Sequence, residues 1–382
     1  MDFRFTEEQE TMRRMARDFA DKEIAPFAGE WDKHNEFPLA TVKRMRELGL
    51  MTIGVPAEYG GAGLDHVSQN LVTEEIARGD AGIATTMVAS TLLGPDPVLV
   101  AATHEQKKWW YEKELEGCMT AFCLTEPGAG SDVGGMATRC YKVGDEYVLN
   151  GNKQFISNGG VAGLYTVFTT LDQKMGLQGM CAFMVDRNTP GISVGPQEDK
   201  LGIRSSNTVP IIFEDVRVPA KNLLGNEGDG FKIAMKTLDI SRTSVAAMAL
   251  GVAQAAYESA AKYSFERYQF GKPIFAFQAI QFMLADMAQY IEAGRLLYLS
   301  ASNKQDQGIP YTQAASLSKC FCGDIAMKVA TDAVQIYGGY GYTKEYPVEK
   351  YFRDAKIMQI FEGTSQVQRM VIAGDIAKTF GK

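Results

Sequence analysis

The hydrophobic pattern changes twice along the chain of 382 residues, and the order of the three patterns limits the fold more than any other feature. Up to residue 117, apolar side chains recur three and four positions apart, as at Met12, Met15 and Phe19, which predicts helices. Between 118 and 225, short apolar runs bounded by Gly, Asn, Asp and Pro predict strands. After residue 225, helical patterns return at 231–262, 277–306, 311–337 and 364–380.

This order predicts an α+β multidomain protein, because a chain of this length exceeds one ordinary hydrophobic core. We expect an N-terminal α-helical domain at 1–117, a middle β domain at 118–225 and a C-terminal four-helix bundle domain at 226–382. Two helical blocks on either side of a β block fit neither a Rossmann alternation nor a TIM barrel. Neither G-x-G-x-x-G nor the phosphate-loop pattern occurs, so a nucleotide cofactor would bind by another route.

Charge and composition exclude several function classes. The net charge of −7 argues against a nucleic-acid surface, which needs concentrated Lys and Arg. The N-terminus has no apolar signal region, so we expect a cytoplasmic protein without membrane insertion. Six scattered cysteines without a C-x-x-C pair, and three isolated histidines, favour buried reduced thiols over disulfides and predict no metal site.

Five stretches have residues suited to ligand binding, but each also has an ordinary structural interpretation. Residues 123–132 combine hydroxyls with glycines and could equally form a surface turn. Residues 155–160 begin with an aromatic side chain that could lie in the core or against a flat ring. Residues 267–272 and 335–341 could end helices in the usual way, with cations and glycines respectively. The fifth stretch, 360–369, is the most informative.

Glu362 stands in a connection just before the last predicted helix. Gly363 follows it, and Thr364 is a residue type that caps helices. A carboxylate here could simply stabilise the helix N-terminus. It could also be presented to a substrate as a base.

The five motifs in this order and spacing resemble the acyl-CoA dehydrogenase family, specifically its short- or medium-chain, butyryl-CoA dehydrogenase-like type, from Phe5 to beyond Ala377. The resemblance implies an N-terminal helical domain, a β-barrel-like middle domain and a C-terminal four-helix bundle. It also implies FAD as cofactor, commonly held between the domains and across a subunit interface of a homotetramer. An acyl-CoA substrate and an electron-transfer flavoprotein would be its partners.

The resemblance also assigns roles to individual residues. Glu362 matches the catalytic base. Residues expected around the flavin ring are Leu124, Thr125, Phe155 and Ser157. Residues expected at the pyrophosphate and adenosine half, or at further FAD contacts, are Arg267, Phe270, Gln335, Gly339, Thr364 and Gln366. Residues expected to bind the CoA moiety are Ser131, Asp239 and Arg242.

Three positions depart from the family pattern. Phe155 stands where Trp is usual, and Phe361 replaces a common Tyr. Asp96, between two prolines, falls where the family lines its acyl pocket. Asp96 could turn outward as a cap, close the pocket against long chains, or contact a functionalised or cyclic acyl group. The outward cap is the interpretation that turn chemistry favours.

The implied reaction is α,β-dehydrogenation of an acyl-CoA to the 2-enoyl-CoA. Glu362 would remove the α-proton while the β-hydride passes to flavin N5, and desolvation would raise the pKa of the base. Hydrogen bonds to the thioester carbonyl would stabilise the developing enolate. An acyl-CoA oxidase and an enoyl-CoA reductase of the same fold remain alternatives, whereas Glu362 in place of Asp argues against a nitroalkane oxidase. A non-catalytic FAD-stabilised binding protein is the alternative from another class.

Overall fold

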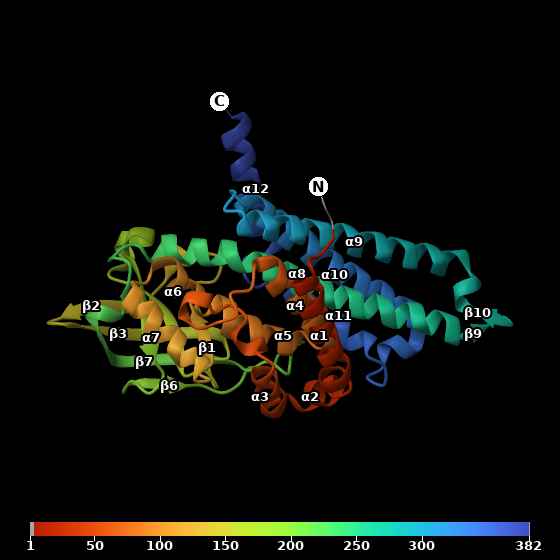
Figure 1. The fold of residues 1–382 in the computed structure, drawn as a ribbon, viewed down its shortest axis with the longest axis horizontal. Helices are drawn as coiled ribbons and strands as arrows, with labels where there is room; N and C mark the ends of the chain where they lie inside the picture. The colour runs from red at the N-terminus through yellow and green to blue at the C-terminus, as the bar shows by residue number, and fades with distance from the viewer. Residues whose placement is uncertain (1–3, 382) are drawn as a thin grey trace.

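A computed structural model describes residues 4–381 and confirms the expected succession of helical, β and helical parts (Figure 1). The N-terminal part is a set of helices in which Thr6 and Thr103 form capping boxes at the starts of the first and the last. These helices are α1 (Glu7–Phe19), α2 (Ala28–His34), α3 (Leu39–Glu47), α4 (His66–Gly79), α5 (Ala81–Val88), α6 (Asp96–Ala101) and α7 (His104–Leu115). The expected domain boundaries remain predictions.

The middle part is an eight-stranded sheet in the order β6-β7-β3-β2-β4-β5-β8, with β1 parallel to β4. Its strands are β1 (Thr120–Cys123), β2 (Arg139–Val143), β3 (Glu146–Ser157), β4 (Leu164–Thr170), β5 (Met180–Asp186), β6 (Ile192–Val194), β7 (Thr208–Pro219) and β8 (Leu223–Leu224). The β3–β7 ladder shifts register between Lys153 and Ile156, where Phe155 has a φ of 59°. At this irregularity the side chains at the end of β3 no longer alternate regularly between the two faces of the sheet.

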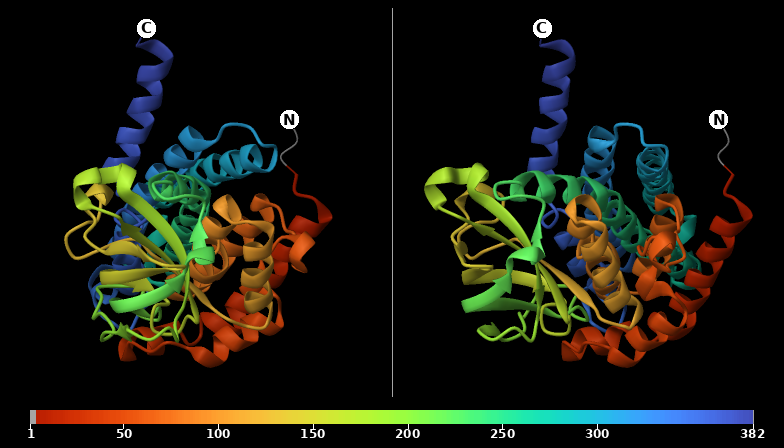
Figure 2. Two further views of the ribbon diagram at one scale, coloured as in Figure 1. Left: turned by 90° about the vertical axis from the view of Figure 1, so that its left-hand side faces the viewer. Right: turned by 60° about the vertical axis from the view of Figure 1, so that its left-hand side comes forward.

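The C-terminal part contains α8 (Gly230–Glu266), α9 (Gln278–Asp306), α10 (Thr312–Tyr337), α11 (Val348–Ile357) and α12 (Ser365–Phe380). A small hairpin of β9 (Tyr268–Gln269) and β10 (Lys272–Pro273) joins α8 to α9. Helices α8, α9 and α10 pack together, while α12 projects from the body (Figures 1 and 2). Only Ser365 and Gln368 of α12 are buried, so this helix is not packed along its length within the chain.

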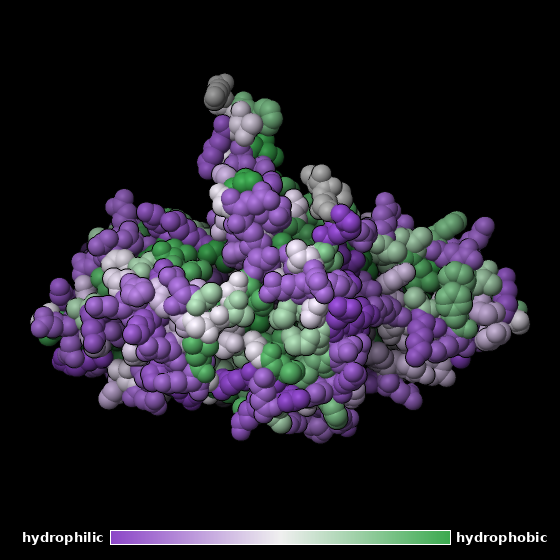
Figure 3. Space-filling model, viewed as in Figure 1, coloured by the Kyte–Doolittle hydropathy of each residue, from purple (hydrophilic) through white to green (hydrophobic). Residues whose placement is uncertain are grey.

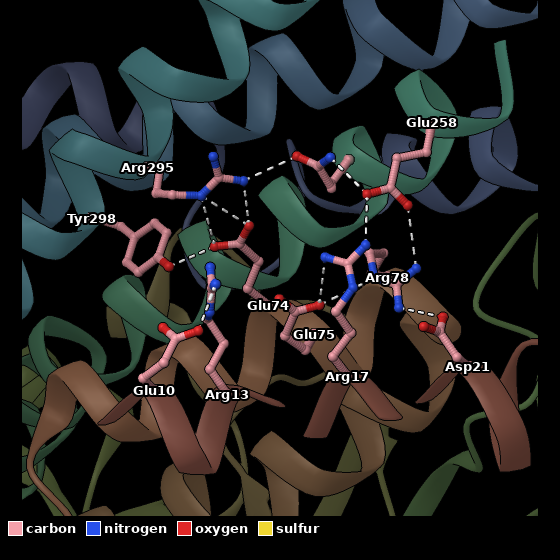
Figure 4. Close-up of polar contacts among 11 residues, drawn as sticks. Glu10, Arg13, Arg17, Asp21, Glu74, Glu75, Arg78, Glu258, Arg295 and Tyr298 are labelled. Carbon is pink, nitrogen blue, oxygen red and sulfur yellow. Dashed lines mark hydrogen bonds and ion pairs between the residues drawn. The ribbon is translucent and has the colours of Figure 1, made fainter. Parts of the chain in front are cut away.

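Helix α4 fixes the N-terminal part to the bundle. At Gly251 on α8 an added Cβ would lie 2.3 Å from the backbone oxygen of Glu74, so only glycine permits this approach. The Glu74 carboxylate accepts hydrogen bonds from Arg295 (2.7 Å) and Tyr298 (2.6 Å) on α9 (Figure 4). Arg78 forms ion pairs with Glu75 on its own helix, with Glu258 on α8 and with Asp21 in the N-terminal part. The relative positions of α4 and the bundle are therefore held by both packing and charge.

One helical stretch, Ala81–Ala101, is long and apolar enough to span a membrane by length and composition, but 89% of the tested window is buried inside the fold. A core helix gives the same signal. The six cysteines are free thiols, five of them buried and Cys118 half-buried, as the expectation of reduced thiols requires.

Candidate active site

Glu362 is presented from the connection between α11 and α12. It has a φ of 56°, and Gly363 follows with a φ of 87°. The side-chain amide of Gln368 donates to the backbone oxygens of both residues, at 3.1 Å each, and Lys319 Nζ donates to Gly363 O at 2.6 Å. The positive φ of Gly363 favours glycine, and a Cβ there would lie 2.6 Å from Gln368 Nε2 and displace that amide. The strained turn is therefore held by two buried side chains.

The start of α12 secures the other side of this turn. Thr364 is the N-cap, and its hydroxyl accepts from the backbone N–H of Val367 at 3.1 Å, as the sequence predicts. The Asp324 carboxylate accepts from Gln359 Nε2 (2.9 Å) and Ser365 Oγ (3.0 Å), so it ties both ends of the turn to α10. Glu362 thus has little freedom of backbone position.

The Glu362 carboxylate has one direct hydrogen-bond donor in the described residues, the hydroxyl of Ser241 on α8, at 2.7 Å. Burial raises the pKa of Glu362, while the Ser241 hydrogen bond and the cations Lys319 and Arg242 oppose that rise. Burial also lowers the pKa of Lys319 to about 8. A carboxylate whose pKa is raised in this way can accept a proton near neutral pH.

Arg242 on α8 lies near this base, and Asp239, three residues earlier, shares its face of the helix. Arg242 is 3% exposed, pairs with Asp239 and lies 3.4 Å from Ser316 Oγ, and burial lowers its pKa. Thr312 Oγ1 donates to Asp239 at 2.7 Å. The structure therefore pairs Asp239 with Arg242, as their spacing on one helix allows, and places Arg242 near Glu362.

Ser131 does not join this group. It is exposed in the loop after β1, and no hydrogen bond within residues 4–381 connects it to Asp239, Arg242 or Glu362. Its expected role in binding CoA stays a prediction.

The residues expected around the flavin ring lie on the loop after β1 and at the end of β3. The backbone N–H of Gln154 donates to Thr125 O at 2.8 Å, which joins the two segments. Leu124 is buried, Thr125 and Ser157 are half-buried, and Phe155 is 61% exposed. The interpretation of Phe155 as a core residue is wrong, because the irregular register at the end of β3 turns its ring outward. An exposed ring beside open hydroxyls suits a flat ligand.

A buried ion pair supports that loop. Lys153 Nζ lies 2.7 Å from Glu126 Oε1 and donates to Leu124 O at 3.1 Å. Burial alone would raise the pKa of Glu126, but Lys153 and the neighbouring backbone N–H groups hold it below its usual value. Lys153 has no local motif that would mark it in the sequence.

A cavity of about 470 Å³ opens where α8 and α10 end, and Arg267, Gly338 and Gly339 are among its lining residues. A Cβ at Gly339 would meet nothing within 4 Å, so its bare backbone is open to a ligand. The Arg267 guanidinium lies 5.3 Å from the centre of the Tyr340 ring. Gln335 is exposed near this end of α10, outside the residues that line the cavity, and Gln366 is exposed on α12.

Phe270, at the tip of the β9–β10 hairpin, is 92% exposed. Figure 1 shows this hairpin and the strands β2 and β3 at opposite ends of the long axis of the molecule. Within one chain, the residues expected at the adenosine half of FAD are therefore separate from the domain that supplies those expected at the flavin ring.

Comparison with protein families decides the assignment. Models of the N-terminal, middle and C-terminal domains of acyl-CoA dehydrogenase match residues 6–117, 121–216 and 228–377. The chain belongs to the acyl-CoA dehydrogenase family. It is 45% identical to the short-chain specific acyl-CoA dehydrogenase of Clostridium acetobutylicum over 98% of this chain and 100% of the relative.

Two solved structures are closely similar. Butyryl-CoA dehydrogenase from Megasphaera elsdenii has a TM-score of 0.96 and 45% identity, covering 98% of this chain and 100% of that one. A chain in a structure described as the electron transferring flavoprotein of Acidaminococcus fermentans has a TM-score of 0.96 and 48% identity, covering 98% and 99%. This acyl-CoA dehydrogenase therefore has the family's three-domain fold, and the expected fold class is confirmed.

Acyl-CoA dehydrogenases use FAD, and the residues of this chain fit that cofactor. The hydroxyls of Thr125 and Ser157 make no hydrogen bond within residues 4–381, and the Phe155 ring beside them is exposed. At the other end, the open backbone of Gly339 and the cation of Arg267 share one cavity. Unpaired donors, an exposed ring and a cation beside bare glycine match a flat heterocycle and a pyrophosphate.

Asp96 is the residue of this acyl-CoA dehydrogenase that differs most from expectation. Its side chain is 4% exposed, so the outward cap is wrong. Asp96 begins α6, which packs against α8, and its carboxyl interacts electrostatically with Glu362. Burial, and then the charge of Glu362, raise the pKa of Asp96 well above its usual value.

Sequence reasoning missed three further side chains that act on the base. Ser241 stands between Asp239 and Arg242, which the resemblance had already identified, so its place on α8 offered a signal. Lys319 offered another, as a single cation within a stretch of small and apolar residues on α10. Gln368 gave no signal, because its contacts depend on the backbone turn at Glu362.

Proposed function

We propose that this enzyme dehydrogenates a short-chain acyl-CoA at its Cα–Cβ bond, with Glu362 as the base that removes the α-proton. The observation that carries the proposal is a carboxylate with a raised pKa, held in a fixed turn between the hydroxyl of Ser241 and two buried cations. The short-chain substrate is proposed from the similarity to the enzymes of C. acetobutylicum and M. elsdenii.

The residues around Glu362 divide the work. One Glu362 oxygen accepts from Ser241, so the other is free to take a proton. The backbone N–H of Glu362 donates no hydrogen bond within residues 4–381, which leaves it able to polarise the thioester carbonyl. Lys319 and Gln368 keep this N–H and the carboxylate in one orientation. When bound, FAD supplies the acceptor for the β-hydride.

Asp239 and Arg242 are proposed to meet the CoA moiety, with Ser131 at the opposite side of the entrance. Arg242 has only partial compensation within the chain, since its Nε makes no hydrogen bond in the described residues although it is buried. A ligand carbonyl or phosphate oxygen would satisfy that donor.

We propose a homotetramer as the working assembly. The projecting helix α12 exposes Met370 (72%) and Phe380 (80%), and Phe270 and Tyr268 are exposed on the hairpin. Figure 3 shows apolar residues at both places on an otherwise largely polar face. Apolar side chains on projecting elements favour burial against other copies. Arg267, Phe270, Gln335 and Gly339 would then complete the FAD site of a neighbouring subunit, and Thr364 and Gln366 would add further contacts.

We propose an electron-transferring flavoprotein as the electron acceptor and the cytoplasm as the location. The similarity to the A. fermentans chain supports the acceptor. The relatives from C. acetobutylicum and M. elsdenii support the location.

Anaerobic mixing of the purified FAD-loaded enzyme with a panel of acyl-CoAs tests the proposal. We expect short saturated acyl-CoAs to bleach the flavin absorbance and an electron-transferring flavoprotein to restore it. If only a reduced electron carrier bleached the flavin absorbance, and only 2-enoyl-CoAs restored it, the protein would be an enoyl-CoA reductase. Rapid reoxidation by oxygen would indicate an oxidase. If no thioester changed the flavin absorbance, the result would favour a non-catalytic FAD-stabilised binding protein.

A further inference from the structure

The carboxyl of Asp96 is buried without a partner. It begins α6 between Pro95 and Pro97, and within residues 4–381 neither of its oxygens has a hydrogen bond. Its Oδ2 is fully enclosed. The Asp96 side chain accepts no hydrogen bond from the backbone N–H groups at the start of α6, so it does not serve as a helix cap. Burying a polar group in this way is unfavourable unless something else completes its hydrogen bonds.

The groups around Asp96 are acids, phenols and apolar side chains. Its carboxyl interacts electrostatically with Glu362, with Glu114 and Tyr111 on α7, and with Tyr311 before α10. Glu114 is also buried, but one of its oxygens accepts from the indole of Trp110 on its own helix. No cation is among the groups that influence Asp96. The described residues therefore offer no group that would compensate this carboxyl.

The unpartnered carboxyl of Asp96 lies near Glu362, the proposed base. The same turn of α6 contributes Val98, which is 0% exposed and belongs to an apolar cluster with Trp110, Tyr111 and Leu124. Asp96 thus lies where that cluster approaches Glu362. A residue that only limited chain length would be apolar, because an apolar side chain fills the same space without the cost of desolvating a carboxyl.

We propose that Asp96 determines specificity by binding a hydrogen-bond donor, a hydroxyl or an ammonium, carried by the acyl group of the substrate. This inference rests on the proposed function, in which Glu362 acts on the same acyl group. Asp96 accepts the donor's proton in a hydrogen bond and thereby gains the partner that the chain does not provide. An acyl group with a terminal carboxylate is disfavoured, since its charge would be buried among acidic groups, with no cation among the groups that influence Asp96.

The experiment compares butyryl-CoA, 4-hydroxybutyryl-CoA and 4-aminobutyryl-CoA on the FAD-loaded enzyme and on Asp96→Leu and Asp96→Asn. We expect the natural enzyme to favour at least one donor-bearing substrate over butyryl-CoA at least tenfold in kcat/KM. Asp96→Leu should reverse this preference, because it replaces a carboxyl by an apolar surface. Asp96→Asn should fall between the two, since an amide still accepts a hydrogen bond. The hydroxyl and ammonium substrates separate a neutral donor from a cationic one.

Glu114→Gln is the matched control, because it removes a buried carboxyl that already has a partner in Trp110. It should change the preference far less than Asp96→Leu. An unchanged preference in Asp96→Leu would overturn the proposal. So would loss of flavin reduction with all three substrates in both Asp96 variants, which would place Asp96 among the reacting groups.

Binding gives a readout that does not depend on turnover. In a Glu362→Gln background, calorimetry should show that Asp96→Leu weakens binding of the donor-bearing thioester at least tenfold while strengthening that of butyryl-CoA. If the natural enzyme reduced its flavin with none of the thioesters, the proposed function would fail, and this measurement would still decide the role of Asp96. Equal affinities for each thioester in Glu362→Gln with and without Asp96→Leu would overturn the proposed role of Asp96.

Discussion

Replacing Lys153 by Met tests whether a buried ion pair shapes the loop proposed to contact the flavin. Lys153 is 0% exposed and pairs with Glu126 at 2.7 Å, and Glu126 also accepts from the backbone N–H groups of Ala137 (2.6 Å) and Thr138 (3.0 Å). Removing one partner of a buried pair leaves the other charge uncompensated, which costs about 3–5 kcal/mol. We therefore expect this loss in the free energy of unfolding, together with weaker FAD retention.

Urea unfolding of the FAD-loaded protein, followed by circular dichroism and flavin fluorescence, measures both effects. Lys174→Met, which removes an exposed lysine from the same domain, is the control and should leave stability unchanged. The double variant Lys153→Met with Glu126→Gln should recover most of the loss, because the remaining amide is neutral and still accepts from the backbone. A single variant within about 1 kcal/mol of the natural protein, or a double variant no better than the single, would refute the reasoning.

Two further predictions concern the base and the assembly. Lys319→Met removes a cation that lowers the pKa of Glu362, so the acid limb of the pH profile of kcat/KM should move to higher pH. Lys328→Met, on the same helix but half-exposed, should leave the acid limb in place. An unmoved acid limb in Lys319→Met would contradict the coupling between Lys319 and Glu362. Arg267→Ala should lose FAD on gel filtration while keeping its helix content, whereas Lys262→Ala, at an exposed position near the same helix end, should keep the cofactor. Full FAD occupancy in Arg267→Ala would remove the proposed role of this cation.

Much of the architecture could be predicted from local pattern. The long helices α8, α9, α10 and α12 begin and end within a few residues of the predicted limits, since their periodic segments are bounded by glycine, proline or capping residues. The short helix α11 (Val348–Ile357) was not predicted, because ten residues between other signals give a weak pattern. The projection of α12 also depends on which partners it has in three dimensions, which its own residues do not indicate.

The site shows the same limit. The turn that presents Glu362 could be anticipated from Gly363 and the capping Thr364, which are neighbours in sequence. The contacts of Ser241 and Lys319 with that turn join positions 121 and 44 residues apart, so no local pattern reveals them. Asp96 was expected to turn outward because prolines flank it, and the packing of α6 against α8 reversed that expectation.

The most direct test of the central claim is anaerobic rapid mixing of Glu362→Gln with the best acyl-CoA substrate. The amide has nearly the shape of the carboxylate and can still accept from Ser241, but it cannot take the proton. We expect FAD content and acyl-CoA affinity close to those of the natural enzyme, with flavin reduction slower by roughly 10²- to 10⁴-fold or more. Flavin reduction at a near-natural rate in this variant would contradict the assignment of Glu362 as the base.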